Sequence, residues 1–147
     1  MSSIEREPLP VVLDLRGEQL FDQMEPDASK LMVDGTMEVT EQGLLLTYQE
    51  PELSGMEGTT TTLELNGPRV ILTRRGAFCS QMIFEEGAPH SSRYQTPFGE
   101  LSLEIRTSRL RHTLTERGGV LEICYAIAVE QTVTGQNRLR LRVIRKG

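Results

Sequence analysis

Five polar side chains in this chain are suited to binding a ligand, and each stands at the end of a segment of alternating sequence: Glu50, Thr59, Arg74, Tyr94 and Thr96. An arginine guanidinium recognises carboxylate or phosphate groups. We expect Arg74 to receive the polar head of a small anionic or amphipathic ligand, with the other four side chains around it. The alternative is a partly buried ion pair between Glu50 and Arg74 that only fixes the register of its strands.

The phase of the alternation indicates where these two charges point. Tyr48 precedes Glu50 on one face of its segment, and Leu72 precedes Arg74 on one face of its own. Because alternate residues of a strand share a face, both charges are expected to point inward. Glu50 and Arg74 would then lie two strands apart with Thr59 between them, and the two charged groups would be within reach of a charge-assisted hydrogen bond. The intervening residues are nearly as apolar, so the outward orientation also stays open.

A second candidate site is the C-terminal segment RLRLRVIRK, in which Arg138, Arg140 and Arg142 alternate with apolar residues and therefore share one strand face. The face is suited to an anionic macromolecule, either protein or nucleic acid. The alternative is an exposed face that lies beside the acidic N-terminal strand, where opposite charges are mildly stabilising. A net charge of -5 and the low aromatic content of 5% argue against nucleic acid.

Catalytic chemistry has little support in the sequence. The two histidines, His90 and His112, stand in no motif that combines a nucleophile, a base and a carboxylate. Glu85 and Glu86 are adjacent, so in a strand they point to opposite faces and do not form a working pair. The chain has no phosphate-binding loop and no set of metal ligands at suitable spacing. We expect a protein that is not an enzyme and carries no cofactor.

The distribution of charge is uneven along the chain. Residues 1–66 hold 14 acidic and 3 basic residues, whereas residues 67–147 hold 7 acidic and 13 basic residues.

Cys79 and Cys124 are the only cysteines, and we expect reduced, mostly buried thiols. The first ten residues carry charges and two prolines where a signal peptide needs an apolar stretch, and no apolar run is long enough to span a membrane. A cytoplasmic protein is predicted, and a homodimer through sheet edges or the acidic N-terminal strand is compatible with the sequence.

Polar and apolar residues alternate with a period of two along most of the chain, which predicts strands rather than helices. The clearest case follows the turn residues Pro97 and Gly99, where Leu101, Leu103 and Ile105 alternate with polar residues. Ten strands are predicted: Leu9–Leu20, Lys30–Thr40, Gly43–Glu50, Gly58–Asn66, Arg69–Arg75, Phe78–Glu85, Ser91–Thr96, Gly99–Leu114, Gly119–Gln131 and Gln136–Lys146. Longer loops are expected at residues 22–29 and 51–57.

Short connections between the predicted strands indicate an up-and-down order. An open sheet of this width leaves long edges and one uncovered apolar face, so closure is expected. The prediction is an all-β protein, a single antiparallel β-barrel of about 8–10 strands over residues 1–147, with a flexible N-terminus at residues 1–8.

Several motifs, in their order, carry a family likeness: TTTTLEL, VILTRRG, QMIFEEG and YQTPFGELSLEIRT. With them the chain resembles the YwiB-like family of uncharacterised bacterial proteins. The resemblance covers about Leu9 to Ile144 and implies a calycin-like barrel, related in shape to the lipocalins. The family has no assigned function, so the resemblance implies no catalytic residues.

Two hypotheses follow for function. The first is non-catalytic binding of a small anionic or amphipathic ligand at one rim of the barrel, which requires an interior cavity. The second is a barrel with a filled core whose charged outer faces bind a macromolecule.

Overall fold

The computed structural model describes residues 7–20, 27–77, 79–96, 99–130 and 132–146. Within these ranges the side chains of eight residues are outside the description: Leu20, Asp27, Ala28, Tyr94, Gln95, Thr96, Leu101 and Thr134. The prediction of a flexible segment at residues 1–8 falls mostly on residues 1–6, which lie outside the described ranges.

The described residues form ten strands in up-and-down order, as the alternation predicts. They are β1 Leu9–Leu20, β2 Asp27–Val39, β3 Gly43–Gln49, β4 Thr59–Asn66, β5 Arg69–Gly76, β6 Ser80–Glu85, β7 His90–Thr96, β8 Gly99–His112, β9 Gly118–Val129 and β10 Thr132–Arg145. The loop after β3 contains a 3-10 turn, Glu52–Ser54. No helix in the described ranges is long and apolar enough to cross a membrane.

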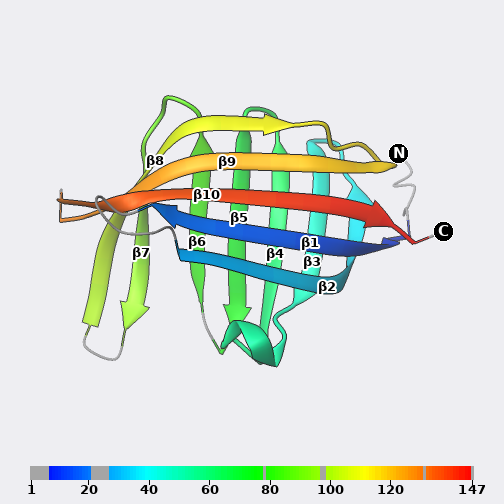
Figure 1. Cartoon of the computed structure of the whole chain (residues 1–147), viewed down its shortest axis with the longest axis horizontal. Coiled ribbons are helices and arrows are strands. Elements are labelled where there is room, and N and C mark those ends of the chain that lie inside the picture. Colours follow the sequence, from blue (N-terminus) through cyan, green and yellow to red (C-terminus); the bar gives the residue numbers. More distant parts are fainter. Residues whose placement is uncertain (1–6, 21–26, 78, 97–98, 131, 147) are drawn as a thin grey trace.

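The strands form one antiparallel sheet in the order β6-β5-β4-β3-β2-β1-β10-β9-β8-β7. This sheet curls into a nearly closed, flattened barrel. Figure 1 shows β1, β2, β9 and β10 crossing the front of the molecule, with β3 to β6 running steeply across them behind. Gly35 lies in β2 where pairing with β1 overlaps pairing with β3. A Cβ there would lie 2.5 Å from the carbonyl oxygen of Thr47, so only glycine permits this close corner.

The seam between β6 and β7 closes the barrel without a described strand ladder. Ser92 Oγ of β7 donates a hydrogen bond to the carbonyl oxygen of Gln81 in β6. After β6, Glu86 accepts hydrogen bonds from the backbone N–H of Leu110 and from Arg111 of β8. The predicted closure is therefore confirmed, but individual polar contacts take the place of a regular ladder.

Apolar side chains from both layers meet inside the barrel and form one continuous core. Fully buried members include Leu13, Met37, Leu46, Phe84 and Ile123. They come from β1, β2, β3, β6 and β9, so the core joins strands from the two crossing layers. Packed apolar side chains therefore connect the two layers.

Candidate functional site

Cross-strand rows on the inner face of β3 to β6 change from apolar to polar toward one end of the barrel. The strand register defines three successive rows. The first is apolar and consists of Leu46, Leu63, Leu72 and Met82, and the second is polar and consists of Tyr48, Thr61, Arg74 and Ser80. The third lies at the ends of the strands and consists of Glu50, Thr59 and Gly76. A polar cluster therefore follows the apolar core on the same inner face.

Glu50 is the centre of this polar cluster, and its side chain is 1% exposed. The carboxylate accepts a hydrogen bond from Thr61 Oγ1 and another from Tyr48. Arg74 Nε lies 3.9 Å from Glu50 Oε2. Burial raises the pKa of the Tyr48 phenol well above its usual range, and the negative charge of Glu50 raises it further. The carboxylate is thus held by two hydroxyl donors and one nearby guanidinium.

The structure places three of the predicted residues together. Glu50 and Arg74 both point inward, as the phase predicted, and they form the expected ion pair. The predicted hydrogen bond between their side chains is wrong, because 3.9 Å is too long and Arg74 Nε has no hydrogen-bond partner in the described ranges. Thr59 is buried nearby, but Thr61 lies opposite Arg74 and donates to Glu50.

Tyr125 of β9 faces this cluster from the opposite layer. Its burial raises the pKa of its phenol, and the positive charge of Arg74 acts in the opposite direction. Its ring meets Phe84 edge-on, with centroids 4.8 Å apart. Thr107 lies opposite Tyr125 in the ladder but bridges Glu86, just past the end of β6 that is remote from Ser80 and Arg74, and its hydroxyl is buried without a hydrogen-bond partner among the described residues. Counting alternate positions along β3 and β4 identifies Tyr48 and Thr61 from the sequence, whereas contacts between strands on opposite sides of the barrel leave no signal in the local sequence.

The remaining two predicted rim residues are only partly described. The backbone of β7 pairs Tyr94 with Leu101 and Thr96 with Gly99, at the end of the strand. The side chains of Tyr94 and Thr96, and residues 97–98 of the turn, lie outside the described part of the chain. Their predicted role in a ligand site therefore stays a prediction.

Four clefts among the described residues lie away from Glu50, although Tyr125 lines two of them. These clefts of about 220 to 360 Å³ are lined by residues of β1, β2, β8, β9 and β10. None of these four is lined by Glu50, Thr59 or Arg74. All four are lined by Arg138 or Arg140, so these concave surfaces lie at the second candidate site.

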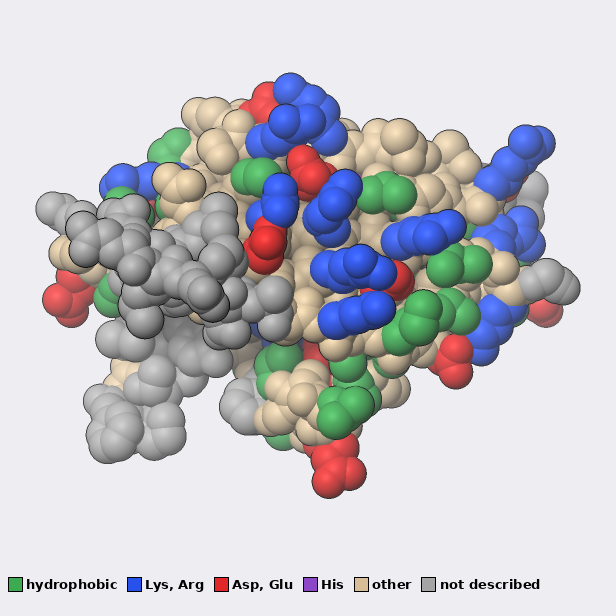
Figure 2. Space-filling model, in the orientation of Figure 1, with side chains coloured by type: hydrophobic (Ala, Val, Ile, Leu, Met, Phe, Trp, Pro, Cys, Tyr) green, Lys and Arg blue, Asp and Glu red, His purple; other side chains and the backbone are tan. Residues whose placement is uncertain are grey.

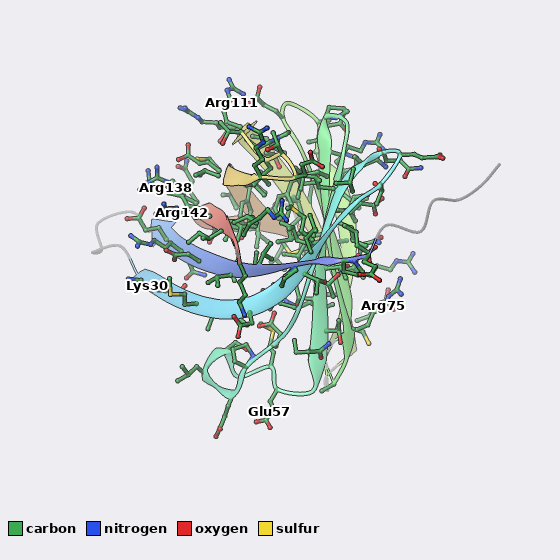
Figure 3. The ribbon with its side chains drawn as sticks, turned by 90° about the vertical axis from the view of Figure 1, so that its right-hand side faces the viewer. Lys30, Glu57, Arg75, Arg111, Arg138 and Arg142 are labelled. Carbon is green, nitrogen blue, oxygen red and sulfur yellow. The ribbon has the colours of Figure 1, made fainter. Side chains whose placement is uncertain are left out.

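That second site is a cationic outer face, which we define by eight side chains on β8, β10, β1 and β2: Arg106, Arg109, Arg111, Arg138, Arg140, Arg142, Arg16 and Lys30. Figure 2 shows lysine and arginine side chains gathered over these strands. Figure 3 shows Lys30, Arg138 and Arg142 on one side of the molecule, with Arg75 on the other. The predicted sharing of a face by the three β10 arginines is confirmed, and five more cations join them.

A β-bulge brings the arginines of β8 onto this face. Arg106 and Arg109 are separated by three positions, so an uninterrupted strand would point them to opposite faces. The register of β8 against β9 shifts between Thr107 and Arg109. After the shift Arg109 pairs with Cys124 and Arg111 with Glu122, on the same side as Arg106.

Acidic side chains hold several of these cations in place. The carboxylate of Glu122 lies 3.3 Å from Nε of both Arg109 and Arg140, and Glu18 accepts a hydrogen bond from Arg138. β10 lies beside β1, so the predicted placement of the arginines next to the acidic N-terminal strand is confirmed. Arg142 has no ion-pair partner in the described ranges.

The two histidines and Cys79 contribute to neither site, whereas Cys124 lies on the cationic outer face, opposite Arg138. His90 Nε2 lies 2.9 Å from Glu85 Oε1, and His112 Nδ1 accepts a hydrogen bond from the backbone N–H of Leu114. No group of three or more potential metal ligands was found within the described ranges. Both thiols are free, but Cys79 is exposed because it lies in the connection between β5 and β6, so the expected burial is wrong for it.

Comparison with known proteins identifies the family. The family described as "Domain of unknown function (DUF1934)" matches residues 13–141. The chain is similar to the crystal structure of ywiB protein from Bacillus subtilis, with a TM-score of 0.82 and 21% identity over 95% of this chain and 94% of that chain. No curated protein matches it. The predicted resemblance to YwiB-like barrels is therefore confirmed, and the chain belongs to the DUF1934 family.

Proposed function

We propose that this protein is a non-catalytic binding module that holds an acidic protein partner on its cationic outer face. The observation that carries the proposal is the convergence of eight cations on one side of the barrel. Arg16, Arg109 and Arg140 keep 58%, 59% and 58% of their side chains exposed, so their guanidinium groups remain open to a partner. Arginine binds carboxylates through paired hydrogen bonds, and clustered positive charge accelerates association with an acidic surface.

Exposed apolar side chains on the same face favour a protein over a nucleic acid. Met32 is 60% exposed, Val120 is 39% exposed and Ile144 is 37% exposed. Val120 lies opposite Arg142 in the ladder, so apolar and cationic groups are interleaved. Arginine and methionine are enriched in protein interfaces, whereas single-stranded nucleic acid is held largely by stacking on aromatic side chains.

The test compares two polyanions at equal charge and length, poly-L-glutamate and a poly-U RNA. Poly-L-glutamate should bind the wild-type protein, and its affinity should fall as salt is raised, because the contacts are exposed. The triple variant R138Q/R140Q/R142Q should lose this binding. The variant R69Q/R75Q/R93Q removes the same charge from β5 and β7 and is the matched control.

Two results would overturn the proposal. The first is equal binding of poly-L-glutamate by both triple variants, since the cationic outer face would then have no special role. The second is a preference for RNA over poly-L-glutamate that depends on the three β10 arginines, which would assign the face to nucleic acid instead.

The two thiols allow the partner to be located. Cys124 lies opposite Arg138 in the ladder and lines a cleft with it, whereas Cys79 is exposed in the connection between β5 and β6. Bound poly-L-glutamate should slow maleimide labelling of Cys124 and leave the labelling of Cys79 unchanged. Equal protection of both thiols would contradict binding at this face.

A second candidate function is binding of a small anionic or amphipathic ligand at the polar end of the barrel. It is favoured by Arg74 Nε, which is buried without a hydrogen-bond partner among the described residues. Buried polar atoms are nearly always satisfied, and a ligand oxygen would satisfy this one. Native mass spectrometry of protein purified from its own host tests this function. A retained small molecule that is lost in Arg74→Met supports it, and an unmodified mass in both proteins contradicts it.

A further inference from the structure

Three cations lie side by side across the middle of the cationic outer face. In the strand register Arg140 of β10 is directly opposite Arg16 of β1, and Arg16 is directly opposite Lys30 of β2. Directly opposed residues have Cβ atoms about 4.5–5.5 Å apart, where like charges destabilise a sheet. This row therefore places positive charges together at a cost to folding.

The neighbouring rows follow the opposite pattern. On one side Arg142 is opposite Asp14, and on the other Arg138 is opposite Glu18. Each of these pairs sets a cation against an anion, which is the stabilising arrangement. The row of Arg140, Arg16 and Lys30, which we call the triple-cation row, departs from the arrangement on both sides of it.

Acidic side chains pair with two of the three members of the triple-cation row. Arg16 lies 3.4 Å from Asp14 of the next row, and Arg140 shares Glu122 with Arg109. Lys30 has no ion-pair partner in the part of the chain that the structure describes. Positive charge thus remains concentrated between β10 and β2.

A hollow lies over this row. Its volume is about 300 Å³, and it is lined by Arg16, Lys30, Arg138 and Arg140 with Gly17, Glu18 and Ser29. Four cations and one carboxylate surround it, and Gly17 contributes no side chain to fill it. At about 30 Å³ for each water molecule, the hollow has room for roughly ten waters, or for a compact anion that keeps part of its hydration.

We infer that this hollow binds a phosphoryl group, in the form of a phosphomonoester dianion. The inference deepens the proposed function, because it rests on the same face and specifies the chemistry of its central contact. A phosphomonoester carries about -1.5 to -2 charges and three acceptor oxygens, and so it matches several converging cations better than one carboxylate does. Arginines on two opposed strands present planar donors that suit these oxygens.

The probes are inorganic phosphate, O-phospho-L-serine and L-aspartate, titrated by calorimetry at constant ionic strength. O-phospho-L-serine should bind with a Kd of about 1 mM or tighter and L-aspartate about ten-fold more weakly. Lys30→Gln removes one cation without breaking a described ion pair and should weaken O-phospho-L-serine binding about ten-fold. Arg142→Gln removes an equally unpaired cation from the neighbouring row and should change the affinity less than about two-fold.

The unfolding temperature provides a second readout with a distinctive sign. In phosphate-free buffer Lys30→Gln should raise the unfolding temperature, because it relieves repulsion in the triple-cation row. Added phosphate should raise the unfolding temperature of the wild-type protein more than that of the variant, because a ligand that binds the folded state stabilises it and the wild-type protein binds phosphate more tightly. A structural role for Lys30 would instead make the variant less stable in both buffers.

The outcomes separate this inference from the proposed function. If poly-L-glutamate binds but phosphate and O-phospho-L-serine do not, the phosphoryl site is refuted and the proposed function stands. If O-phospho-L-serine binds through Lys30 while poly-L-glutamate does not bind, the phosphoryl site stands without the proposed function. Equal binding of O-phospho-L-serine and L-aspartate would refute the assignment to a phosphoryl group.

Discussion

The substitution Thr61→Val tests whether the polar end of the barrel depends on the hydrogen bond to Glu50. Thr61 is 0% exposed and donates to a carboxylate that is itself 1% exposed. Valine has the same shape and suits a strand equally well, so the change removes a donor without opening a cavity. A hydrogen bond to a charged group contributes about 1.5–3 kcal/mol to stability. Because Tyr48 and Arg74 still support the carboxylate, we expect a loss of about 2 kcal/mol.

The assay is urea unfolding followed by far-UV circular dichroism, since the chain contains no tryptophan. With a denaturant slope of about 2 kcal/mol per molar urea, the midpoint should fall by about 1 M. The neighbouring substitution Thr60→Val is the matched control. The hydroxyl of Thr60 donates to Gln49 on the exposed face, and its loss should change stability by less than about 0.5 kcal/mol.

Equal midpoints for Thr61→Val and Thr60→Val would refute this reasoning, because the buried donor would then contribute no more than the exposed one. The double variant T61V/E50Q gives an independent check. The two changes should be coupled by at least about 0.5 kcal/mol, since both act on one hydrogen bond. Additive effects would mean that the two side chains do not interact in solution.

Three further predictions concern the corner, the core and the seam. Gly35→Ala places a Cβ 2.5 Å from the carbonyl oxygen of Thr47 and should destabilise the fold by about 1–3 kcal/mol, measured by urea unfolding. Phe84→Ala removes a ring that is 1% exposed and should cost about 3–5 kcal/mol, with a smaller loss for Phe84→Leu in the same assay. Hydrogen bonds to His90 and then Arg69 lower the pKa of Glu85, and bonds from Leu110 and Arg111 lower that of Glu86. The stability that these two carboxylates contribute is fully present above the ordinary pKa of 4.5 and is lost as pH falls below it. Amide hydrogen exchange at the seam should therefore accelerate below about pH 4.5 in the wild type, and less in E85Q/E86Q.

Most of the fold follows from the period of two in the sequence. The alternation sets the bounds of β1 at Leu9–Leu20, as predicted, and those of the other strands to within a few residues. The largest differences lie where alternation is weak. β10 begins at Thr132 rather than Gln136, because its ladder with β9 continues past a register shift, and β2 begins at Asp27 rather than Lys30, because its ladder with β1 continues past the last clear alternation.

The polar cluster could be predicted only in part. Counting alternate positions was enough to place Glu50 and Arg74 inward, and the same count extended to β4 points to Thr61. Tyr125 approaches Arg74 from the opposite layer, and no spacing in the sequence encodes a contact between strands that are not neighbours. The predicted residue Thr59 lies one row beyond Thr61, in the row of Glu50.

The cationic outer face shows a different limit. The three β10 arginines are visible in the sequence because they alternate strictly. Arg106 and Arg109 have opposite parity, and only the bulge at Ser108 places them on one side. The opposition of Arg16 to Arg140 depends on the register between the first and last strands, which the sequence does not specify locally.

The pairing of β1 with β10 also determines when this barrel can be completed during synthesis. The two strands come from opposite ends of the chain, yet they are adjacent in the middle of the sheet. A ribosome makes the chain from its N-terminus, so β1 can pair with β2 early, but its other edge stays unpaired until β10 exists. β2 to β6 can pair with their sequence neighbours during translation, whereas the ladder between β1 and β10 must wait until β10 has left the ribosome. Its formation requires the closure of nearly the whole chain into one loop, and we therefore expect it to be slow relative to the hairpins.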